Sequence, residues 1–258
     1  MNNWSVNSGV AAVAFWLRAA GCAVLCFFSL LVTPLAGAAG WSIDPVRIVL
    51  LPEHPAAITV GNDSDEPTSI QVQAVAWTQL DGKDVYTPTR ELLVSPPIFT
   101  IAPHSEQVIR VALRRQADPA VELAYRINLQ ELPPQPKPGL NGLQVALRIG
   151  LPVFVPPKID KDVSKMVWKI SRMPDQKLKI GLTNHGNEHI QVSDFSIYVP
   201  GSDKPIASEA GSSYVLPGQA REWLVKLDST KKIGSDRVHF KAYTDAGNID
   251  TDIVLGKP

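Results

Sequence analysis

The most regular apolar pattern in the chain covers residues 143–155. Every second position in it carries a large aliphatic side chain, namely Leu143, Val145, Leu147, Ile149, Leu151, Val153 and Val155. A period of two residues predicts a β-strand, because successive side chains of a strand point to opposite faces. Such a strand is much longer than the usual length of about 5–6 residues. We therefore expect part of the row to cover the chain's own core and the rest to be available to another molecule, although an ordinary central strand of a sandwich alternates in the same way.

Shorter strand-like runs recur about every 8–15 residues over the rest of the chain after residue 38, and turn signals separate them. Asp44-Pro45 indicates a kink in the first of these runs, residues 41–51, and Asp81-Gly82 indicates a hairpin. No segment after residue 38 holds a convincing apolar period of 3.6 residues. The pattern predicts an all-β fold built from antiparallel sandwiches.

The first 38 residues have the organisation of a secretory signal peptide. Arg18 is the only charged residue before Asp44, an apolar run covers residues 19–33, and three small residues follow at 36–38. The apolar run is short for a membrane span, and this ending suits signal peptidase. We expect cleavage after Ala38, and an uncleaved N-terminal anchor is the alternative. No later run is apolar for long enough to cross a bilayer, so we do not expect the mature chain to be embedded in a membrane.

The cysteine content excludes two kinds of site, and the overall charge balance points to no strongly charged partner, although local basic sites remain open. Cys22 and Cys26 both lie in the signal peptide, so the mature chain can hold neither a disulfide nor a thiolate metal site. Loss of Arg18 with the signal peptide reduces the 25 basic side chains to 24, against 25 acidic ones. This near balance favours neither a nucleic acid nor a membrane surface as a partner.

The mature part has about 220 residues, which suits one large or two small domains. A short and polar segment with two prolines, residues 156–162, separates two series of strand-like runs. We expect a signal peptide at 1–38, an N-terminal sandwich at 39–157 and a second, smaller sandwich at 158–258. A linker this short holds two domains at an angle, and clefts between domains are favoured binding sites.

The chain contains no pattern that indicates catalysis, a cofactor or a metal ion. His185 and His189 are four residues apart, but they flank a turn between strands, where this spacing does not place two imidazoles on one face. Nucleophile-elbow, phosphate-loop and dinucleotide-binding patterns do not occur. We therefore expect a binding protein rather than an enzyme, with no cofactor.

Several motifs of the expected first domain occur in a defined order. They are SPPIF at 95–99, AP at 102–103, QVIRV at 107–111, YRINLQELPP at 125–134 and LQVAL at 143–147. Together with the signal peptide and the two small sandwiches, these motifs resemble the periplasmic chaperones of the chaperone–usher pilus pathway. The resemblance covers residues 41–157 well and the second domain only in size and strand content.

This resemblance implies a periplasmic protein with two immunoglobulin-like sandwich domains joined at an angle, in a boomerang shape. It implies that the partners are pilin subunits, which the chaperone binds by donor-strand complementation and delivers to an outer-membrane usher for pilus assembly. It also implies a set of donor residues. Leu143, Val145 and Leu147 match the alternating donor residues of the family, and Ile149 and Leu151 extend the row.

The family also anchors the C-terminal carboxylate of the subunit with basic side chains. Arg47 matches an arginine on the family's first strand, whereas Pro152 stands where the family has a lysine on the last strand. Arg126 is the substitute that we expect, because a divergent branch of the family, whose subunits resemble spore coat protein U, has an arginine here. Arg148 is a weaker candidate, which can equally be an ordinary exposed side chain.

Two other classes of protein stay open. A pilin or other structural sandwich would be one domain with a free alternating N-terminal extension, but here the alternating segment is internal and a second domain follows. A secreted carbohydrate-binding or hydrolytic module would favour clustered exposed aromatic residues or paired carboxylates, and neither stands out.

Overall fold

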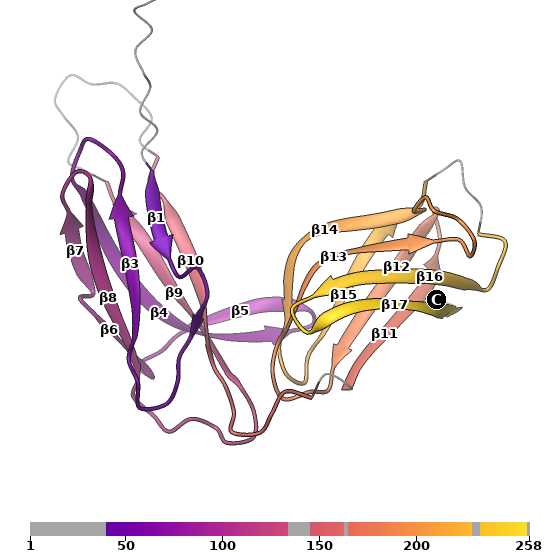
Figure 1. Ribbon diagram of the computed structural model, residues 1–258, viewed down its shortest axis with the longest axis horizontal. Helices are drawn as coiled ribbons and strands as arrows, with labels where there is room; N and C mark the ends of the chain where they lie inside the picture. Colours follow the sequence, from indigo (N-terminus) through magenta and orange to yellow (C-terminus); the bar gives the residue numbers. More distant parts are fainter. Residues whose placement is uncertain (1–39, 134–144, 163–164, 229–232, 257–258) are drawn as a thin grey trace, which may run out of the picture. The chain divides into compact units, whose positions relative to one another are not determined.

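A computed structural model describes residues 40–133, 145–162, 165–228 and 233–256, and its regular elements are strands that form two sandwiches (Figure 1). The first sandwich contains β1 (Trp41–Asp44), β2 (Ile48–Val49), β3 (Ala56–Asn62), β4 (Thr68–Leu80), β5 (Lys83–Pro88), β6 (Leu92–Ser95), β7 (Ile98–Ile101), β8 (Ser105–Leu113), β9 (Leu123–Leu132) and β10 (Arg148–Val155). The second contains β11 (Met166–Met173), β12 (Lys177–Asn184), β13 (Ile190–Tyr198), β14 (Ala207–Val215), β15 (Ala220–Lys226), β16 (Arg237–Thr244) and β17 (Gly247–Gly256). The expected all-β fold is confirmed.

Two sheets of the first sandwich enclose one apolar core. One sheet has the order β1-β3-β8-β6, and the other has the order β2-β10-β9-β4-β5 with β7 also paired to β4. Inward-facing aliphatic side chains from both sheets are fully buried, among them Ile58, Ile109, Ile127 and Val153. These side chains occupy alternate positions of their strands, which is why the period of two residues was visible in the sequence.

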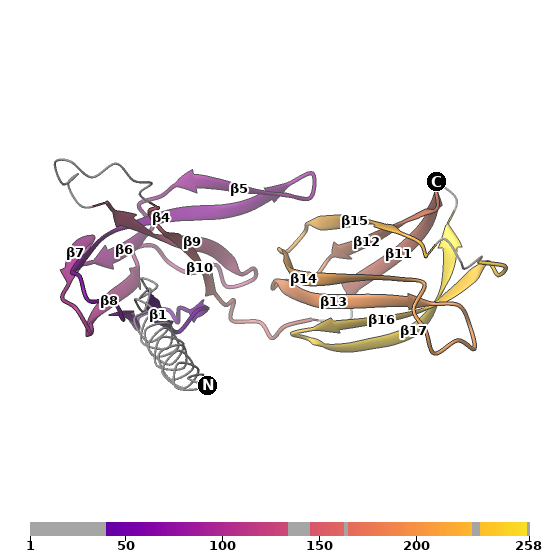
Figure 2. The same cartoon turned by 90° about the horizontal axis from the view of Figure 1, so that it is seen from above.

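The hairpin of β4 and β5 extends past the other strands of its sheet (Figure 2). Its two-residue turn is Asp81-Gly82, with φ angles of 51° and 72°. Both angles lie in the left-handed region, which an Asp-Gly pair adopts at low cost in a tight hairpin. The hairpin predicted from this pair is confirmed.

The expected strand at residues 41–51 is two short strands. β1 pairs with β3 in one sheet, and β2 pairs with β10 in the other, so the chain changes sheets between them. Asp44-Pro45, which is a cis peptide bond, lies at the change. Proline has no N–H group for a sheet ladder, so a strand is readily interrupted there.

The expected single strand at residues 143–155 is shorter in the structure. β10 begins only at Arg148, and residues 145–147 are not part of a strand. The amide of Leu147 donates a hydrogen bond to the side-chain carboxylate of Glu131 (2.9 Å) rather than to a backbone carbonyl. A side chain therefore replaces one of the two backbone hydrogen bonds of this residue pair, whereas the amide of Glu131 still donates to the carbonyl of Leu147. Residues 143 and 144 lie outside the described residues.

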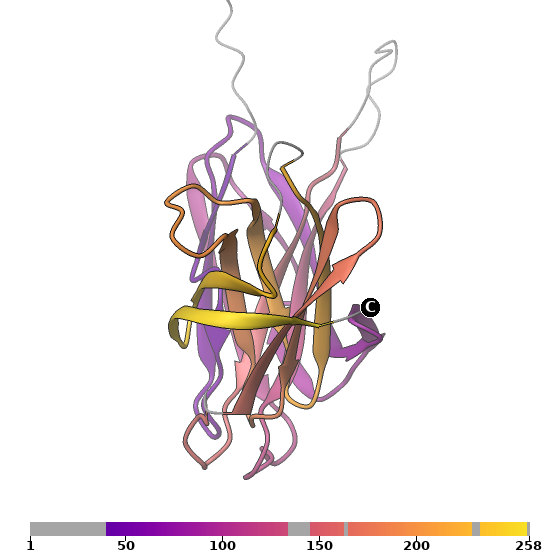
Figure 3. The same ribbon diagram turned by 90° about the vertical axis from the view of Figure 1, so that its right-hand side faces the viewer.

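The second sandwich follows a continuous strand order, β14-β13-β16-β17-β11-β12-β15. Strand β17 joins the two halves of this order, because it pairs antiparallel with β16 along its length and parallel with β11 at its last residues. Figure 3 brings β16 and β17 (yellow) to the front. The core of the second sandwich is centred on Ile170, Phe195 and Phe240, each buried.

Candidate functional site

The open edge of β10 is the first feature of the candidate site. β10 pairs with β9 along its whole length but with β2 only near its end. The carbonyl of Phe154 accepts a hydrogen bond from Leu50 on the β2 side (2.8 Å), and the carbonyl of Leu147 accepts one from Glu131 on the β9 side (2.9 Å). Backbone groups of successive residues point to opposite sides of a strand. Those of Gly150 therefore point to the β2 side, where no strand of the described residues pairs beside it.

The apolar row expected to serve as donor residues is divided between solvent and core. The side chain of Val145 is 73% exposed, and Leu147 and Ile149 are half-buried. Leu151 is only 3% exposed and lies in the core of the first sandwich. Leu143 lies outside the described residues. The exposed end of the row is thus next to the open edge, whereas Leu151 already packs within the protein.

A cleft of about 500 Å³ is the second feature, and it brings together two of the three arginines expected to bind a carboxylate. Arg47 and Arg126 both line it, together with Gly150 and Pro152 from β10. Arg148 does not line it. This residue is exposed at the start of β10, opposite Gln130 of β9.

Arg126 reaches the cleft from β9 across a space left by Gly150. A Cβ atom on Gly150 would lie 3.1 Å from Oδ1 of Asn128 and 3.3 Å from Nη1 of Arg126, so both side chains would have to shift by a few tenths of an ångström to admit it. The guanidinium lies over two aromatic rings, 4.7 Å from the ring centroid of Trp77 and 5.4 Å from that of Tyr86. These contacts orient the guanidinium by cation–π attraction and leave its hydrogen-bond donors for other groups. Its Nε atom is buried and has no partner among the described residues.

Arg47 lies in the bend just before β2 and is held by the second sandwich. Its Nη1 atom donates to the side-chain oxygen of Gln191 (3.0 Å) and lies 3.5 Å from Asp245 Oδ2. The side chain is 42% exposed, so this ion pair by itself is worth little. The contact still fixes which way the guanidinium points.

A buried ionic group joins the two sandwiches beside this cleft. Glu122, just before β9, accepts hydrogen bonds from both the backbone amide and the imidazole Nδ1 of His189, at 3.0 and 2.8 Å. On its other side, Nε2 of His189 lies 3.4 Å from Asp245 Oδ2, without the alignment of a full hydrogen bond. The imidazole also stacks on Phe154 of β10, with ring centroids 3.6 Å apart. His189 is thus enclosed by two carboxylates and an aromatic ring.

The ionisation of His189 follows from these neighbours. Burial alone would lower the pKa of the imidazole, but its contacts with Asp245 and Glu122 outweigh burial and raise the pKa above 6.5. Asp245 also lies near two cations, Arg47 at 3.5 Å and Lys161 at 3.8 Å. The buried ionic group is therefore connected to the arginine cleft through Asp245.

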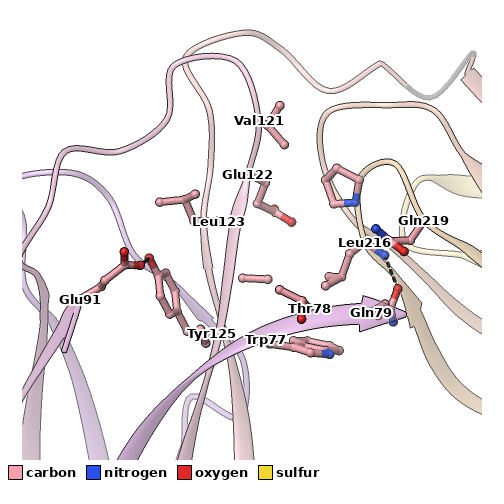
Figure 4. A pocket seen from close by; sticks show the side chains of 13 residues that line it. Trp77, Thr78, Gln79, Glu91, Val121, Glu122, Leu123, Tyr125, Leu216 and Gln219 are labelled. Atoms are coloured by element: carbon pink, nitrogen blue, oxygen red, sulfur yellow. Dashed lines mark hydrogen bonds between the residues drawn. The ribbon is translucent and has the colours of Figure 1, made fainter. Parts of the chain in front are cut away.

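A smaller pocket of about 260 Å³ lies beside β4 (Figure 4). At its edge, the side chain of Gln79 donates to the carbonyl of Tyr214 (2.8 Å) and accepts from the amide of Leu216 (2.9 Å). The pocket's two acidic groups already have partners within the protein. Glu91 accepts from the hydroxyl of Tyr125 and Glu122 from His189. This pocket belongs to the contact between the sandwiches.

The described residues contain no group of three histidine, cysteine or acidic side chains placed to hold a metal ion. His185 and His189, the pair singled out in the sequence, differ in their surroundings, because His185 is exposed and His189 is buried. Among the residues that the structure describes, no helix is long and apolar enough to span a bilayer.

Comparison with protein families identifies the first sandwich. Residues 40–159 match the model of a family described as pili and flagellar-assembly chaperone, PapD N-terminal domain. This chain carries a pilus-chaperone domain. The motifs of residues 95–147 thus predicted the family of this domain, and its chaperone role, correctly. A search of curated proteins finds no match to this chain.

Solved structures extend the likeness over both sandwiches of the chaperone. One is the CsuC–CsuE chaperone–tip adhesion subunit pre-assembly complex of archaic Csu pili from Acinetobacter baumannii, with 18% identity, a TM-score of 0.59 and coverage of 85% of this chain and 100% of that one. Another is the E. coli chaperone DraB, with 23% identity, a TM-score of 0.55 and coverage of 85% and 97%. A third is the Salmonella enterica SafA pilin in complex with the SafB chaperone, with 20% identity, a TM-score of 0.56 and coverage of 85% and 98%. These similarities establish the fold of two immunoglobulin-like sandwiches.

Proposed function

We propose that this chain is a periplasmic chaperone that binds pilin subunits by lending them the edge of β10 and delivers them to an outer-membrane usher. The observation that carries the proposal is the open edge of β10, which continues into an exposed apolar side chain at Val145. Such an edge can add a strand to another sheet while its alternate side chains fill a groove there. The activity is stoichiometric binding, and no catalysis is part of it.

The donor row supplies enough apolar burial for a stable complex. Burial of a large aliphatic side chain stabilises by roughly 1.5–3 kcal/mol. Leu143 and Val145 would contribute this in full, and the half-buried Leu147 and Ile149 about half of it, so the gross gain is roughly 5–9 kcal/mol before the costs of association. Leu151 was expected to extend the row, but its burial in the chaperone's own core supports a role in positioning β10 instead.

The arginine cleft supports the second part of the proposal, an anchor for the C-terminal carboxylate of the subunit. A guanidinium presents two parallel donors to a carboxylate. Arg47 and Arg126 line one cleft next to β10, so a subunit paired with β10 can place its terminus there. Arg148 remains a candidate only for a carboxylate bound outside this cleft.

The anchor is tested with single substitutions. We expect Arg126→Ala and Arg47→Ala each to weaken subunit capture at least tenfold, because loss of one partner of a buried charge pair costs about 2–5 kcal/mol. The measurement is recovery of a co-expressed pilin subunit on the tagged chaperone, together with a melting curve of the free chaperone, which should change little. Arg148→Ala is the control and should reduce recovery less. Capture that survives deletion of the subunit's last residues, or that depends on Arg148 alone, would show that the anchor is assigned wrongly.

The periplasmic location is a separate prediction. We propose that residues 1–38 are a signal peptide and that the mature protein consists of two domains at 39–157 and 158–258. N-terminal sequencing of the protein from a periplasmic extract should begin near Ala39. A protein that retains Arg18 and fractionates with membranes would contradict this prediction.

A further inference from the structure

A third arginine lines the same cleft as Arg47 and Arg126, and it comes from the second sandwich. Arg221 is the second residue of β15, and its Nη1 atom lies 3.5 Å from the carbonyl of Tyr214, another residue of the cleft wall. The backbone of Arg221 also lies beside the turn of the β4–β5 hairpin, because a Cβ atom on Gly82 would be 3.8 Å from its Cα atom. Arg221 thus lies where the hairpin of the first sandwich meets β15 of the second.

The three guanidinium groups line one cleft, and the pKa directions of two tyrosines agree with this arrangement. Burial raises the pKa of Tyr86, and the nearby charges of Arg126 and Arg221 both lower it in part. Burial likewise raises the pKa of Tyr214, which feels the charges of Arg47 and Arg126. Arg126 and Arg221 thus both affect the pKa of Tyr86, and Arg47 and Arg126 both affect the pKa of Tyr214.

The wall of the cleft has a positive charge balance, because it contains three guanidinium groups and one carboxylate. This carboxylate belongs to Asp84, which already accepts hydrogen bonds from the indole of Trp77 (3.0 Å) and the amide of Gln79 (2.9 Å). Arg47 forms an ion pair with Asp245. Arg126 and Arg221 form no ion pair with any of the described residues. Three like charges around one cavity repel one another, and a bound anion removes this cost.

We propose that Arg221 is a third carboxylate-binding residue of this cleft, so that both sandwiches of the chaperone hold the bound carboxylate. As a statement about the C-terminus of a pilin subunit, the proposal rests on the anchor function proposed above. A carboxylate offers two oxygens with about four acceptor sites, enough for donors from three guanidinium groups. The second sandwich then takes a direct part in binding, beyond supporting Arg47 through Gln191 and Asp245.

The test begins without a subunit and uses citrate as the carboxylate probe. Titration of citrate into the mature chaperone at low ionic strength, followed by calorimetry, should give saturable binding. We expect Arg221→Gln and Arg126→Gln each to weaken citrate binding at least tenfold. Arg221→Lys, which keeps the charge but not the planar fork, should lie in between. Arg237→Gln is the matched control, because Arg237 is an exposed arginine of the second sandwich outside the cleft wall.

Capture of a co-expressed pilin subunit by the same variants separates the two proposals. Arg221→Gln with wild-type citrate affinity, beside a weakened Arg126→Gln, would overturn the role of Arg221 and leave the anchor of the first sandwich intact. Citrate binding that needs Arg221, together with subunit capture that tolerates all three arginine substitutions, would support Arg221 as an anion ligand and overturn the proposed anchor. We expect citrate affinity and subunit recovery to fall together.

Discussion

Val145→Asp leaves the free chaperone folded and abolishes its capture of a pilin subunit. In the free protein the side chain of Val145 is 73% exposed and precedes β10, so an aspartate there remains in water. In the complex the same side chain would enter an apolar groove of the subunit, where a carboxylate without a partner is strongly unfavourable. The expected result is no recovered subunit and an unchanged melting curve. Leu147→Asp should act in the same direction, with some loss of stability because Leu147 is half-buried.

Two further variants make this result specific. Ala146→Asp is the matched control, because Ala146 is also exposed but belongs to the opposite set of the alternation. It should leave capture close to the wild-type level. Leu151→Asp should unfold the first sandwich, because its side chain is 3% exposed within the core. If Val145→Asp still captures the subunit, or if it unfolds the free protein, the exposed end of the row is not the donor segment.

The alternation of apolar residues predicted the strand β10 but not where it begins. Residues 148–155 follow the pattern, and their inward side chains are in the core. The same pattern extends to Val145, yet β10 begins only at Arg148, and the amide of Leu147 donates to the side-chain carboxylate of Glu131 instead of its backbone carbonyl. Side-chain patterning reports which face a residue would present. It does not show whether a side chain from another strand, here Glu131, accepts the hydrogen bond of a backbone amide in place of a backbone carbonyl.

The arginine cleft was predictable only in part, for a related reason. Resemblance to the chaperone family pointed to Arg47 and Arg126, which do line one cleft. Arg221 lies in the second sandwich, where the family motifs gave no guide, at a point where the turn of the β4–β5 hairpin lies beside β15. The sequence offered one signal for that contact, the Asp-Gly turn of the hairpin, but not its partner strand.

His189 shows the same limit most clearly. In the sequence it is one of two histidines flanking a polar turn, and nothing distinguishes it from His185. In the structure only His189 of the two is buried, because Glu122 and Asp245 pack against its imidazole. Both carboxylates come from segments far from His189 in the sequence, so the sequence around it does not reveal them. A histidine held between two carboxylates is therefore a result of how the two sandwiches pack.

We expect His189→Ala to lower the free energy of unfolding by about 3–5 kcal/mol, the usual cost of removing one member of a buried ionic pair. Glu122, whose side chain is 2% exposed, would lose both its charged partner and a hydrogen bond at 2.8 Å. Phe154 would lose the ring stacked on it at 3.6 Å. Urea unfolding followed by tryptophan fluorescence measures the loss, and His185→Ala is the matched control, since His185 is an exposed histidine of the same turn.

The same contact gives the stability of the chaperone a defined dependence on pH. The pKa of His189 in the folded protein lies above its ordinary value of 6.5, so the folded state holds the proton more tightly than the unfolded chain. The stabilisation is therefore complete below about pH 6.5 and is lost as the pH rises through the raised pKa. His189→Gln keeps a hydrogen-bond donor for Glu122 but cannot titrate, so its unfolding free energy should be flat over this window, apart from contributions that the His185→Gln control shares. A wild-type protein that gains stability over the same rise in pH would show that His189 is held neutral, and that the two carboxylates do not act on it as the geometry indicates.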